Sequence, residues 1–368
     1  MHVSFYKKTP QNTYRVMSEK RKLPFASDYM ATGHKQILNR IAQSLNETII
    51  GYGFDQYCKT AKDKIRIACQ CPNATIHFLV GGTQTNATVI DALLRPWQGV
   101  ISASTGHING HEAGAIEATR HKVITLPHSN GKISAENIRN YIDNFHADSS
   151  NNHLVQPGMV YLSQPTEYGT LYSLSELKEI STLCEENNLL LFVDGARLAY
   201  ALACKDNDVT LPQLTQLCDV FYIGGTKCGA MFGEAVVARD ANVLPNFFTL
   251  MKQHGAVLAK GWLLGLQFDE LFSEKENGKY LYELCGAQGI RLSQKLRNGL
   301  AKKGIEQFIP STTNQTFAII NNDTIRELEK QVELTLWEPY NEKQSIVRFV
   351  TSWASTEADI DNLLELIK

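Results

Sequence analysis

Short apolar runs alternate with amphipathic segments through the middle of the chain. Seven runs of four to six residues lie at residues 75–80, 99–102, 122–126, 159–162, 189–193, 220–223 and 234–238. Strands of a parallel sheet that is covered on both faces read as continuous apolar runs, and the helices between them read as amphipathic segments. The pattern therefore predicts an α/β fold with a mostly parallel seven-stranded sheet.

Helical spacing is clearest between the fourth and fifth of these runs. Residues 174–187 place leucine, isoleucine and cysteine side chains on one face of a helix. Ser173 or Ser175 can cap the first turn by accepting its free N–H groups. A second segment with helical spacing follows the first apolar run, at residues 85–94.

The pattern changes after Asp240, because residues 241–268 contain no acidic side chain. A helix-rich segment, two strands and a last helix are then expected at residues 269–303, 316–320, 346–351 and 356–366. These elements predict a smaller α+β domain behind the large one. We expect three parts: an N-terminal arm that packs with the small domain, a large domain and the small domain, at residues 1–36, 37–255 and 256–368.

Composition narrows the class of protein. The 368 residues are 43% hydrophobic, and 36 Lys and Arg against 38 Asp and Glu leave a formal net charge of −2. Proteins that bind nucleic acid or an anionic membrane usually carry a large excess of Lys and Arg. We therefore expect neither nucleic acid nor a membrane as a partner.

Cysteine usage and the N-terminal sequence indicate a compartment. Eight cysteines are too few for a disulfide scaffold, and no apolar run has the length of a signal peptide or a membrane span. Cys69 and Cys71 could form half of a metal site, but no second pair follows at zinc-finger spacing, so we expect no metal. The sequence predicts a soluble, cytoplasmic protein.

Candidate chemistry follows the predicted strands, because ligands of open parallel sheets bind beyond the carboxyl ends of the strands. Residues 81–86 read Gly-Gly-Thr-Gln-Thr-Asn. The glycines let the backbone approach an anion, and the helix start and the Thr83 hydroxyl offer donors. The segment has neither the Walker A nor the dinucleotide pattern. We interpret it as a phosphate cradle, with a plain turn as the alternative.

Asp194 and Arg197 follow the fully apolar run at residues 189–193. A buried carboxylate requires a cationic or hydrogen-bonding partner. One interpretation is an internal Asp194–Arg197 pair. The other is that Asp194 meets a protonated ring nitrogen, while the guanidinium of Arg197 binds a substrate carboxylate.

Lys227 lies in the segment Gly-Gly-Thr-Lys-Cys-Gly-Ala at residues 224–230, directly after another apolar run. A lysine among small residues, with no acid beside it, can be desolvated. Its amine is then available to form a Schiff base. A phosphate ligand is the alternative.

His107 and His111 are four residues apart in a segment that follows the second apolar run. This spacing could place two metal ligands on one helix face, but Gly110 weakens such a helix and no third ligand is evident. A pair of this kind is more often structural. Beside an aromatic cofactor, an imidazole can instead stack on the ring.

These four segments, in this order, resemble the threonine aldolase family of pyridoxal-phosphate enzymes, which has the aspartate-aminotransferase-like fold, also called fold type I. The resemblance covers roughly residues 24–355 and lies in the phosphate loop, the histidine segment, the Asp-Gly-Ala-Arg motif and the Schiff-base motif, at residues 78–86, 106–115, 193–197 and 224–229. The Gly-Gly-Thr-Lys form resembles one branch of the low-specificity L-threonine aldolases, within the β-eliminating lyase and threonine aldolase group.

The resemblance implies pyridoxal 5'-phosphate as the cofactor and gives roles to the matching residues. Lys227 would form the Schiff base, Asp194 would keep the ring nitrogen protonated, and His107 would stack on the ring. The remaining cofactor-binding residues would be Gly82, Thr83, Arg197 and Thr226, the first two at the phosphate.

The resemblance also implies a substrate site. Arg197 would bind the substrate α-carboxylate, and Arg348 matches a second carboxylate-binding arginine from the small domain. As a strand residue, Arg348 could equally lie on a solvated face. Ser27 would reach the same carboxylate, although Tyr29 stands where the family motif has threonine.

Three further residues come from the same comparison with the family. Basic residues near the positions of Lys252 and Lys260 reach the cofactor phosphate of the neighbouring subunit. The resemblance therefore implies a homodimer or homotetramer with active sites at the subunit interface, and a solvated basic helix is the alternative. Tyr52, in a Tyr-Gly segment, is expected to lie near the substrate.

One departure concerns the base that acts on the substrate β-hydroxyl. Many family members have a histidine in the loop after the fourth apolar run, and this chain has Thr166-Glu167-Tyr168-Gly169 there. Glu167 takes the corresponding position, and a carboxylate can also act as a base, directly or through water.

The implied reaction is retro-aldol cleavage of L-threonine, L-allo-threonine or a related β-hydroxy-α-amino acid to glycine and an aldehyde. β-Elimination or transamination on the same fold is the nearest alternative, since bond choice depends on geometry. A non-catalytic binding protein that kept the fold is an alternative of another class. A metal hydrolase that uses His107 and His111 is a third.

Overall fold

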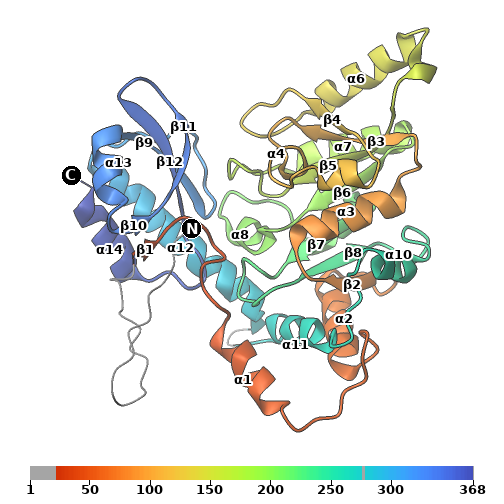
Figure 1. The fold of residues 1–368 in the computed structure, drawn as a ribbon, viewed down its shortest axis with the longest axis horizontal. Helices are drawn as coiled ribbons and strands as arrows, with labels where there is room; N and C mark the ends of the chain where they lie inside the picture. The colour runs from red at the N-terminus through yellow and green to blue at the C-terminus, as the bar shows by residue number, and fades with distance from the viewer. Residues whose placement is uncertain (1–21, 276–277, 368) are drawn as a thin grey trace, which may run out of the picture.

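The structure is a computed structural model that describes residues 22–275 and 278–367 (Figure 1). The first 21 residues of the expected N-terminal arm lie outside the described residues. Within the described part of the chain, no helix is long and apolar enough to cross a membrane.

The larger unit is built on a seven-stranded sheet with the order β2-β8-β7-β6-β5-β3-β4. In chain order its strands are β2 (Thr75–Leu79), β3 (Gln98–Ala103), β4 (Val123–Leu126), β5 (Gln156–Ser163), β6 (Leu190–Asp194), β7 (Val220–Gly224) and β8 (Glu234–Ala238). Only β8 runs antiparallel to its neighbours. The expected mostly parallel sheet is confirmed, and each strand lies at one of the seven apolar runs.

Helices cover both faces of this sheet, because alternate strand side chains point to opposite faces and almost all of them are buried (Figure 1). The helices are α1 (Lys35–Gln43), α2 (Gln56–Ala68), α3 (Gly82–Leu93), α4 (His107–Gly110), α5 (Ala115–Ala118), α6 (Ala135–Ala147), α7 (Leu174–Glu186), α8 (Leu198–Ala203), α9 (Leu211–Leu217), α10 (Phe247–Gln253) and α11 (Trp262–Leu271), with a 3₁₀ turn at Asn151–His153. Of the two expected caps, Ser173 is the one that caps α7, in a reciprocal capping box with Glu176. α3 begins three residues before the expected start, so that its first turn faces the functional site.

The smaller unit is a three-stranded antiparallel sheet with helices against one face. Its elements are α12 (Leu281–Lys302), β9 (Gln315–Asn321), α13 (Asn322–Leu328), β11 (Thr335–Pro339), β12 (Gln344–Val350) and α14 (Glu357–Leu366). A short parallel pair, β1 (Leu23–Pro24) with β10 (Val332–Glu333), ties the N-terminal segment to this unit. β11 is an edge strand with half-exposed side chains, and such a strand lacks the apolar run by which the others were predicted.

The packing of α11 bears on the boundary between the two units, which was expected at residue 255. Leu264, Phe268 and Leu271 of α11 belong to the core of the large sheet, and Phe268 stacks on Phe78 of β2 with ring centroids 5.2 Å apart. The next helix, α12, packs on both units, since Gly286 lies against α8 while Leu292 and Leu296 lie in the core of the small unit. We therefore propose that the large unit extends through α11.

Candidate active site

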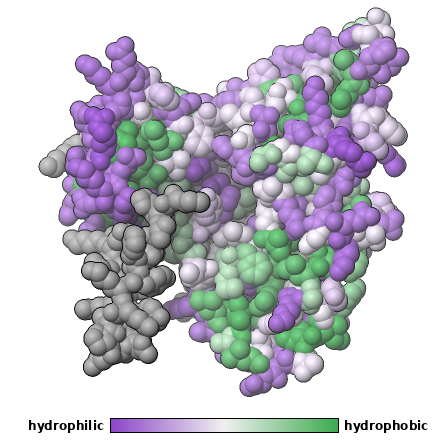
Figure 2. Space-filling view, in the orientation of Figure 1, coloured by the Kyte–Doolittle hydropathy of each residue, from purple (hydrophilic) through white to green (hydrophobic). Residues whose placement is uncertain are grey.

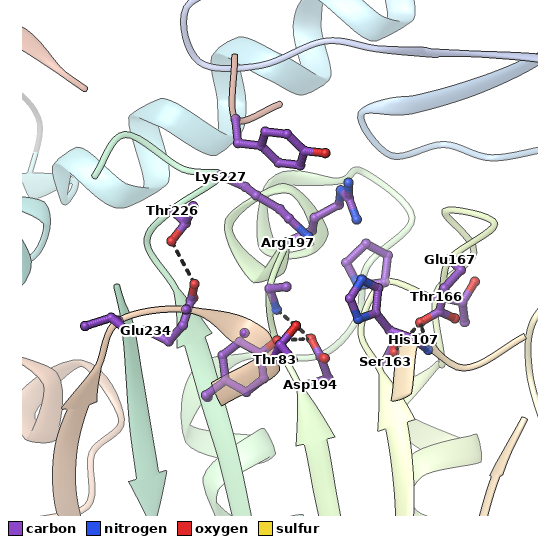
Figure 3. A pocket seen from close by; sticks show the side chains of 17 residues that line it. Thr83, His107, Ser163, Thr166, Glu167, Asp194, Arg197, Thr226, Lys227 and Glu234 are labelled. Atoms are coloured by element: carbon purple, nitrogen blue, oxygen red, sulfur yellow. Dashed lines mark hydrogen bonds between the residues drawn. The ribbon is translucent and has the colours of Figure 1, made fainter. Parts of the chain in front are cut away.

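One cavity lies beyond the carboxyl ends of β5, β6 and β7, beside the first turn of α3 (Figure 3). Eight of the residues singled out in the sequence line it together: Gly82, Thr83, His107, Glu167, Asp194, Arg197, Thr226 and Lys227. They come from five separate segments, and the sheet brings these segments together because parallel strands end at the same edge.

Asp194, the last residue of β6, is a carboxylate surrounded by donors. The Tyr161 and Tyr222 hydroxyls donate to it at 2.5 and 2.6 Å, the Ala196 N–H at 2.9 Å and the Asn86 amide at 3.1 Å. Burial alone would raise the pKa of Asp194, but His107 and these hydrogen bonds outweigh it and hold the pKa below its ordinary value. Asp194 is therefore anionic without an arginine partner, and the internal Asp194–Arg197 pair is not what the structure contains.

Lys227 lies in a loop that the backbone packs closely against β6. A Cβ at Gly224 would come within 2.3 Å of the Ala196 carbonyl oxygen, and the Gly224 N–H donates to the Gly195 carbonyl at 3.0 Å. Among residues 22–275 and 278–367, no partner forms a hydrogen bond or ion pair with the Lys227 ammonium. Burial, and then the charge of Arg197, lower the pKa of Lys227. Its amine is therefore available as a nucleophile.

His107 is held by a buried carboxylate. Its Nδ1 lies 2.7 Å from Oε1 of Glu112, and the Asn86 amide donates to the same oxygen at 2.8 Å. Because Asn86 also donates to Asp194, the imidazole and the Asp194 carboxylate belong to one network. Glu112 was not singled out in the sequence, although it lies only five residues after His107.

The structure places the rings of the two histidines of this segment close together. The His111 ring lies on the exposed side of α4, with its centroid 5.7 Å from that of His107. In the described ranges, no group of three or more His, Cys, Asp or Glu side chains could hold a metal ion.

Glu167 lies beside His107, in the loop after β5. Its Oε1 accepts hydrogen bonds from the Ser163 hydroxyl at 2.7 Å and from the backbone N–H of His107 at 3.0 Å. Burial raises the pKa of Glu167, and the Ser163 hydrogen bond partly opposes that rise. A carboxyl group that faces the cavity can exchange a proton with a bound substrate, and a raised pKa makes it a stronger base.

Arg197 is paired with an aspartate that the sequence did not indicate. Its Nε and one Nη donate to the Asp28 carboxylate at 2.7 and 3.1 Å, and the Asn314 amide donates to Asp28 at 2.9 Å. Burial would lower the pKa of Arg197, but Asp28 raises it above its ordinary value. A substrate carboxylate would therefore bind to a guanidinium whose orientation Asp28 already fixes.

Arg348, on β12, lies near Arg197 and forms no ion pair with an acidic side chain of the described residues. Its guanidinium carbon lies 5.1 Å from the centroid of the Trp337 ring. The guanidinium also donates three hydrogen bonds, which are long, at 3.4 to 3.5 Å. Its Nε is buried and unpaired in the described structure. Burial, and then the charge of Arg197, lower the pKa of Arg348 to about 10. Arg348 is thus a half-buried cation with an unpaired donor, rather than a residue on a solvated face.

Four expected residues lie away from this cavity. Ser27 lines another cavity, next to α14, and the residue of its segment that reaches the site is Tyr29. Lys252 and Lys260 are exposed near α10 and α11. Tyr52 is also exposed, and the Lys252 ammonium lies 4.7 Å from the centroid of its ring.

The start of α3 has the features of an anion site. Gly81 precedes the helix without a side-chain cap, so that the N–H groups of the first turn are available, and no atom lies within 4 Å of a Cβ built on Gly81. The cavity is also lined by three residues that were not singled out in the sequence, Glu234, Tyr222 and Ser163. Glu234 and Tyr222 could have been found in the sequence, because each is a polar side chain in an otherwise apolar strand.

Comparisons with known proteins agree with this site. The model of the β-eliminating lyase family matches residues 24–331. A low-specificity L-threonine aldolase from a Pseudomonas species is 29% identical over 318 residues, which are 85% of this chain and 87% of the relative. The solved structure of a threonine aldolase from Leishmania major is 42% identical, with a TM-score of 0.88, over 94% of this chain and 98% of its own. Aspartate aminotransferase from Thermus thermophilus, at 15% identity over 94% of this chain and 90% of its own, with a TM-score of 0.68, shares the fold alone.

Proposed function

This chain belongs to the β-eliminating lyase family, in its threonine aldolase group, and from that premise we propose that it cleaves L-threonine or a related β-hydroxy-α-amino acid to glycine and an aldehyde. It has fold type I of the pyridoxal-phosphate enzymes, as expected from the sequence. The observation that carries the proposal is the cavity itself, in which a free amine, an anionic carboxylate and an anion site face one another.

The residues around the cavity fit pyridoxal 5'-phosphate. The unpaired Lys227 amine suits its aldehyde, and the Asp194 carboxylate suits its protonated ring nitrogen. The uncapped first turn of α3, with Gly82 and Thr83, suits its phosphate. When bound, the cofactor supplies an electron sink for the electron pair that the breaking Cα–Cβ bond releases.

Lys227 and Asp194 prepare the site for this cofactor. Because burial lowers the pKa of Lys227, a larger fraction of its amine is neutral and nucleophilic. The tyrosine hydroxyls keep Asp194 ionised at neutral pH, so that it can accept a hydrogen bond from a protonated nitrogen. His107 is oriented by Glu112 and can stack on the ring.

Two arginines would fix the substrate. Arg348 offers the α-carboxylate a guanidinium whose Nε is unpaired in the described structure and whose other hydrogen bonds are long, and Arg197 offers the N–H groups that Asp28 leaves free. Two-point binding of this carboxylate orients the bond to be broken, and orientation is a large part of the catalysis of such reactions. Glu167 then takes the proton of the substrate β-hydroxyl, a role supported by its raised pKa and its place in the cavity wall.

A second copy of the chain would complete the assembly. The rings of Phe54 and Phe248 lie near Lys252 in a tilted arrangement, with centroids 5.5 Å apart, and both are exposed together with Leu45, Ile50 and Tyr52. Figure 2 shows apolar side chains gathered over this lower part of the large unit. Large exposed apolar patches mark interaction sites. A homodimer or homotetramer that buries this patch would place Lys252 and Lys260 at the subunit interface.

The free cysteines support a reducing compartment. All eight are unpaired, and seven of them are buried. Cytosolic proteins keep their thiols reduced, so a cytoplasmic location is part of the proposal.

Substitution of Lys227 tests the function. The purified protein is mixed with pyridoxal 5'-phosphate and L-threonine, and glycine formation and the visible absorption band of the bound cofactor are measured. K227A should lose the band and reduce glycine formation on the order of a thousandfold, the loss typical of removing a covalent catalytic group.

Lys178→Ala is the matched control, because Lys178 is an exposed residue of α7 far from the cavity. It should keep both the band and the activity. Glycine formation by K227A at the wild-type rate would refute the assignment of Lys227. A keto acid in place of glycine would show β-elimination or transamination instead of aldol cleavage.

A further inference from the structure

Glu234 is a buried carboxyl group at the phosphate end of the cavity. It is the first residue of β8, where it pairs with Leu79 at the end of β2 and with Gly224 at the end of β7. β2 leads into the glycine segment, and β7 leads into the Lys227 loop. Glu234 is only 3% exposed and lines the same cavity as Gly82 and Thr83.

The hydrogen bonds of Glu234 use the hydroxyl of Thr226 as a donor. The Thr226 Oγ1 donates to Oε1 of Glu234 at 2.8 Å, and the Gly225 N–H donates to Oε2 at 3.2 Å (Figure 3). The Gly233 N–H donates to the Thr226 Oγ1 at 3.0 Å. A hydroxyl has one proton, so in this arrangement Thr226 has none left to donate to a phosphate.

A carboxylate at this place also opposes phosphate binding, because like charges at close range disfavour each other. Both difficulties disappear if the carboxyl is protonated. We propose that the bound cofactor phosphate requires a protonated Glu234, which takes up a proton on binding wherever it is ionised beforehand, and that this proton reverses the hydrogen bond so that the Thr226 hydroxyl donates to the phosphate. The inference rests on the proposed function, since the phosphate is that of pyridoxal 5'-phosphate.

The hydrogen-bonding capacity of Thr226 accommodates this reversal. The Thr226 Oγ1 would accept from the Gly233 N–H and from the Glu234 O–H, and it would donate its own proton to the phosphate. One donor and two acceptor positions are the full capacity of a hydroxyl. The proton comes from solvent, and no covalent bond between heavy atoms changes. Glu234 is therefore a positioning residue that acts through Thr226.

The pKa of Glu234 depends on several titratable and charged groups that surround it. Lys227 and Cys228 face it from the loop after β7, and Asp194, Tyr222 and Tyr282 face it from β6, β7 and α12. Burial raises the pKa of Glu234 to about 8, while the Thr226 hydrogen bond and Lys227 oppose the rise and Asp194 adds to it. A dianion bound nearby would raise this pKa further.

The test compares pyridoxal 5'-phosphate with pyridoxal, which lacks the phosphate. Dissociation constants are measured from pH 6.5 to 9.5 for the wild-type protein and for E234Q. Below its pKa, Glu234 already carries the proton and binding costs nothing extra. Above it, binding must take a proton from solvent, so the wild-type Kd for pyridoxal 5'-phosphate should rise about tenfold per pH unit above about pH 8.

In E234Q this step should be absent, because the glutamine amide can donate to Thr226 at every pH. Pyridoxal should show no such step with either protein. Titration of Lys227 or of the cofactor itself also changes Kd with pH, but it does so equally in the wild-type protein and in E234Q. Subtracting the E234Q profile from the wild-type profile therefore removes these contributions. Calorimetry of the wild-type protein near pH 8.5 in two buffers of different ionisation enthalpy should report uptake of about one proton more than E234Q.

T226V is the second variant. It keeps the shape of threonine and removes the hydroxyl, so it should weaken pyridoxal 5'-phosphate roughly ten- to a hundredfold and leave pyridoxal affinity unchanged. Equal pH profiles for wild type and E234Q, or the same step with pyridoxal, would overturn the inference. If E234Q does not fold, T226V and the wild-type proton uptake decide the question. A wild-type protein that binds neither compound at any pH would refute the proposed function instead.

Discussion

At the scale of single residues, the proton affinity of Glu167 results from two opposing influences. Burial raises its pKa, and the hydrogen bond from Ser163 lowers it. A base must lose its own proton before it can accept one from the substrate. The activity of a Glu167-dependent enzyme therefore falls as the pH drops through this raised pKa.

Two substitutions test this role through the pH profile of kcat/KM. E167Q should lower activity roughly a hundred- to ten-thousandfold, the usual contribution of a general base, and should leave cofactor binding intact. S163A removes the hydroxyl that stabilises the carboxylate, so the acid limb of its kcat/KM profile should move to higher pH. The profile of E167Q should show no acid limb from this group. An unchanged acid limb in both variants would assign the base to another residue.

Residues at strand ends could be predicted from the sequence, because a parallel sheet brings its carboxyl ends together whatever the loops do. Asp194 and Lys227 are examples. Their partners could not be predicted in this way. Asp28 reaches Arg197 across 169 residues of chain, through a contact that only the packing of the N-terminal segment creates. Glu234 opens an apolar run, and its burial depends on β2 and β7 closing on both sides.

At the scale of elements, α11 shows why the sequence and the packing suggest different boundaries between the two units. Most of its sequence lies in the acid-free stretch after Asp240, where the strand pattern has ended, and a helix that is buried nearly all round does not reveal which sheet it packs on. α11 packs on the large unit through a close contact between Gly265 and α2. A Cβ at Gly265 would lie 2.5 Å from the Cys58 backbone nitrogen, so α11 and α2 touch almost backbone to backbone.

This contact leads to a prediction about stability. G265A should lower the free energy of unfolding by about 1 to 3 kcal/mol, because the added methyl group forces the two helices apart. Denaturant unfolding of the purified protein measures the change. Gly110→Ala is the control, since no atom lies within 4 Å of a Cβ at that position, and it should stay within about 1 kcal/mol of wild type. Equal stability of the two variants would contradict the close packing of α11 on α2.

At the scale of the whole molecule, the exposed aromatic pair Phe54 and Phe248 predicts a subunit contact. Phe54 is 69% exposed in the single chain. A carboxylate placed in an apolar interface loses its hydration, so F54E should raise the dimer dissociation constant by about tenfold or more. Sedimentation velocity at micromolar protein concentration measures the assembly.

Leu154→Glu is the matched control, because Leu154 is 47% exposed on a loop of the opposite side of the large unit. It should leave the assembly unchanged. If F54E sediments like the wild-type protein, the patch around Phe54 is not the interface, and Lys252 has no role in a neighbouring site.

The position of β2 has a consequence for how the chain is made. β2 is the edge strand of the large sheet, and its single neighbour there is β8, which follows about 160 residues later. A ribosome that adds 5 to 20 residues per second needs roughly 8 to 30 s for that interval. Throughout this time the nascent chain holds an apolar strand with no hydrogen-bonding neighbour. The phosphate end of the active site is thus among the last features of the large unit to form during synthesis.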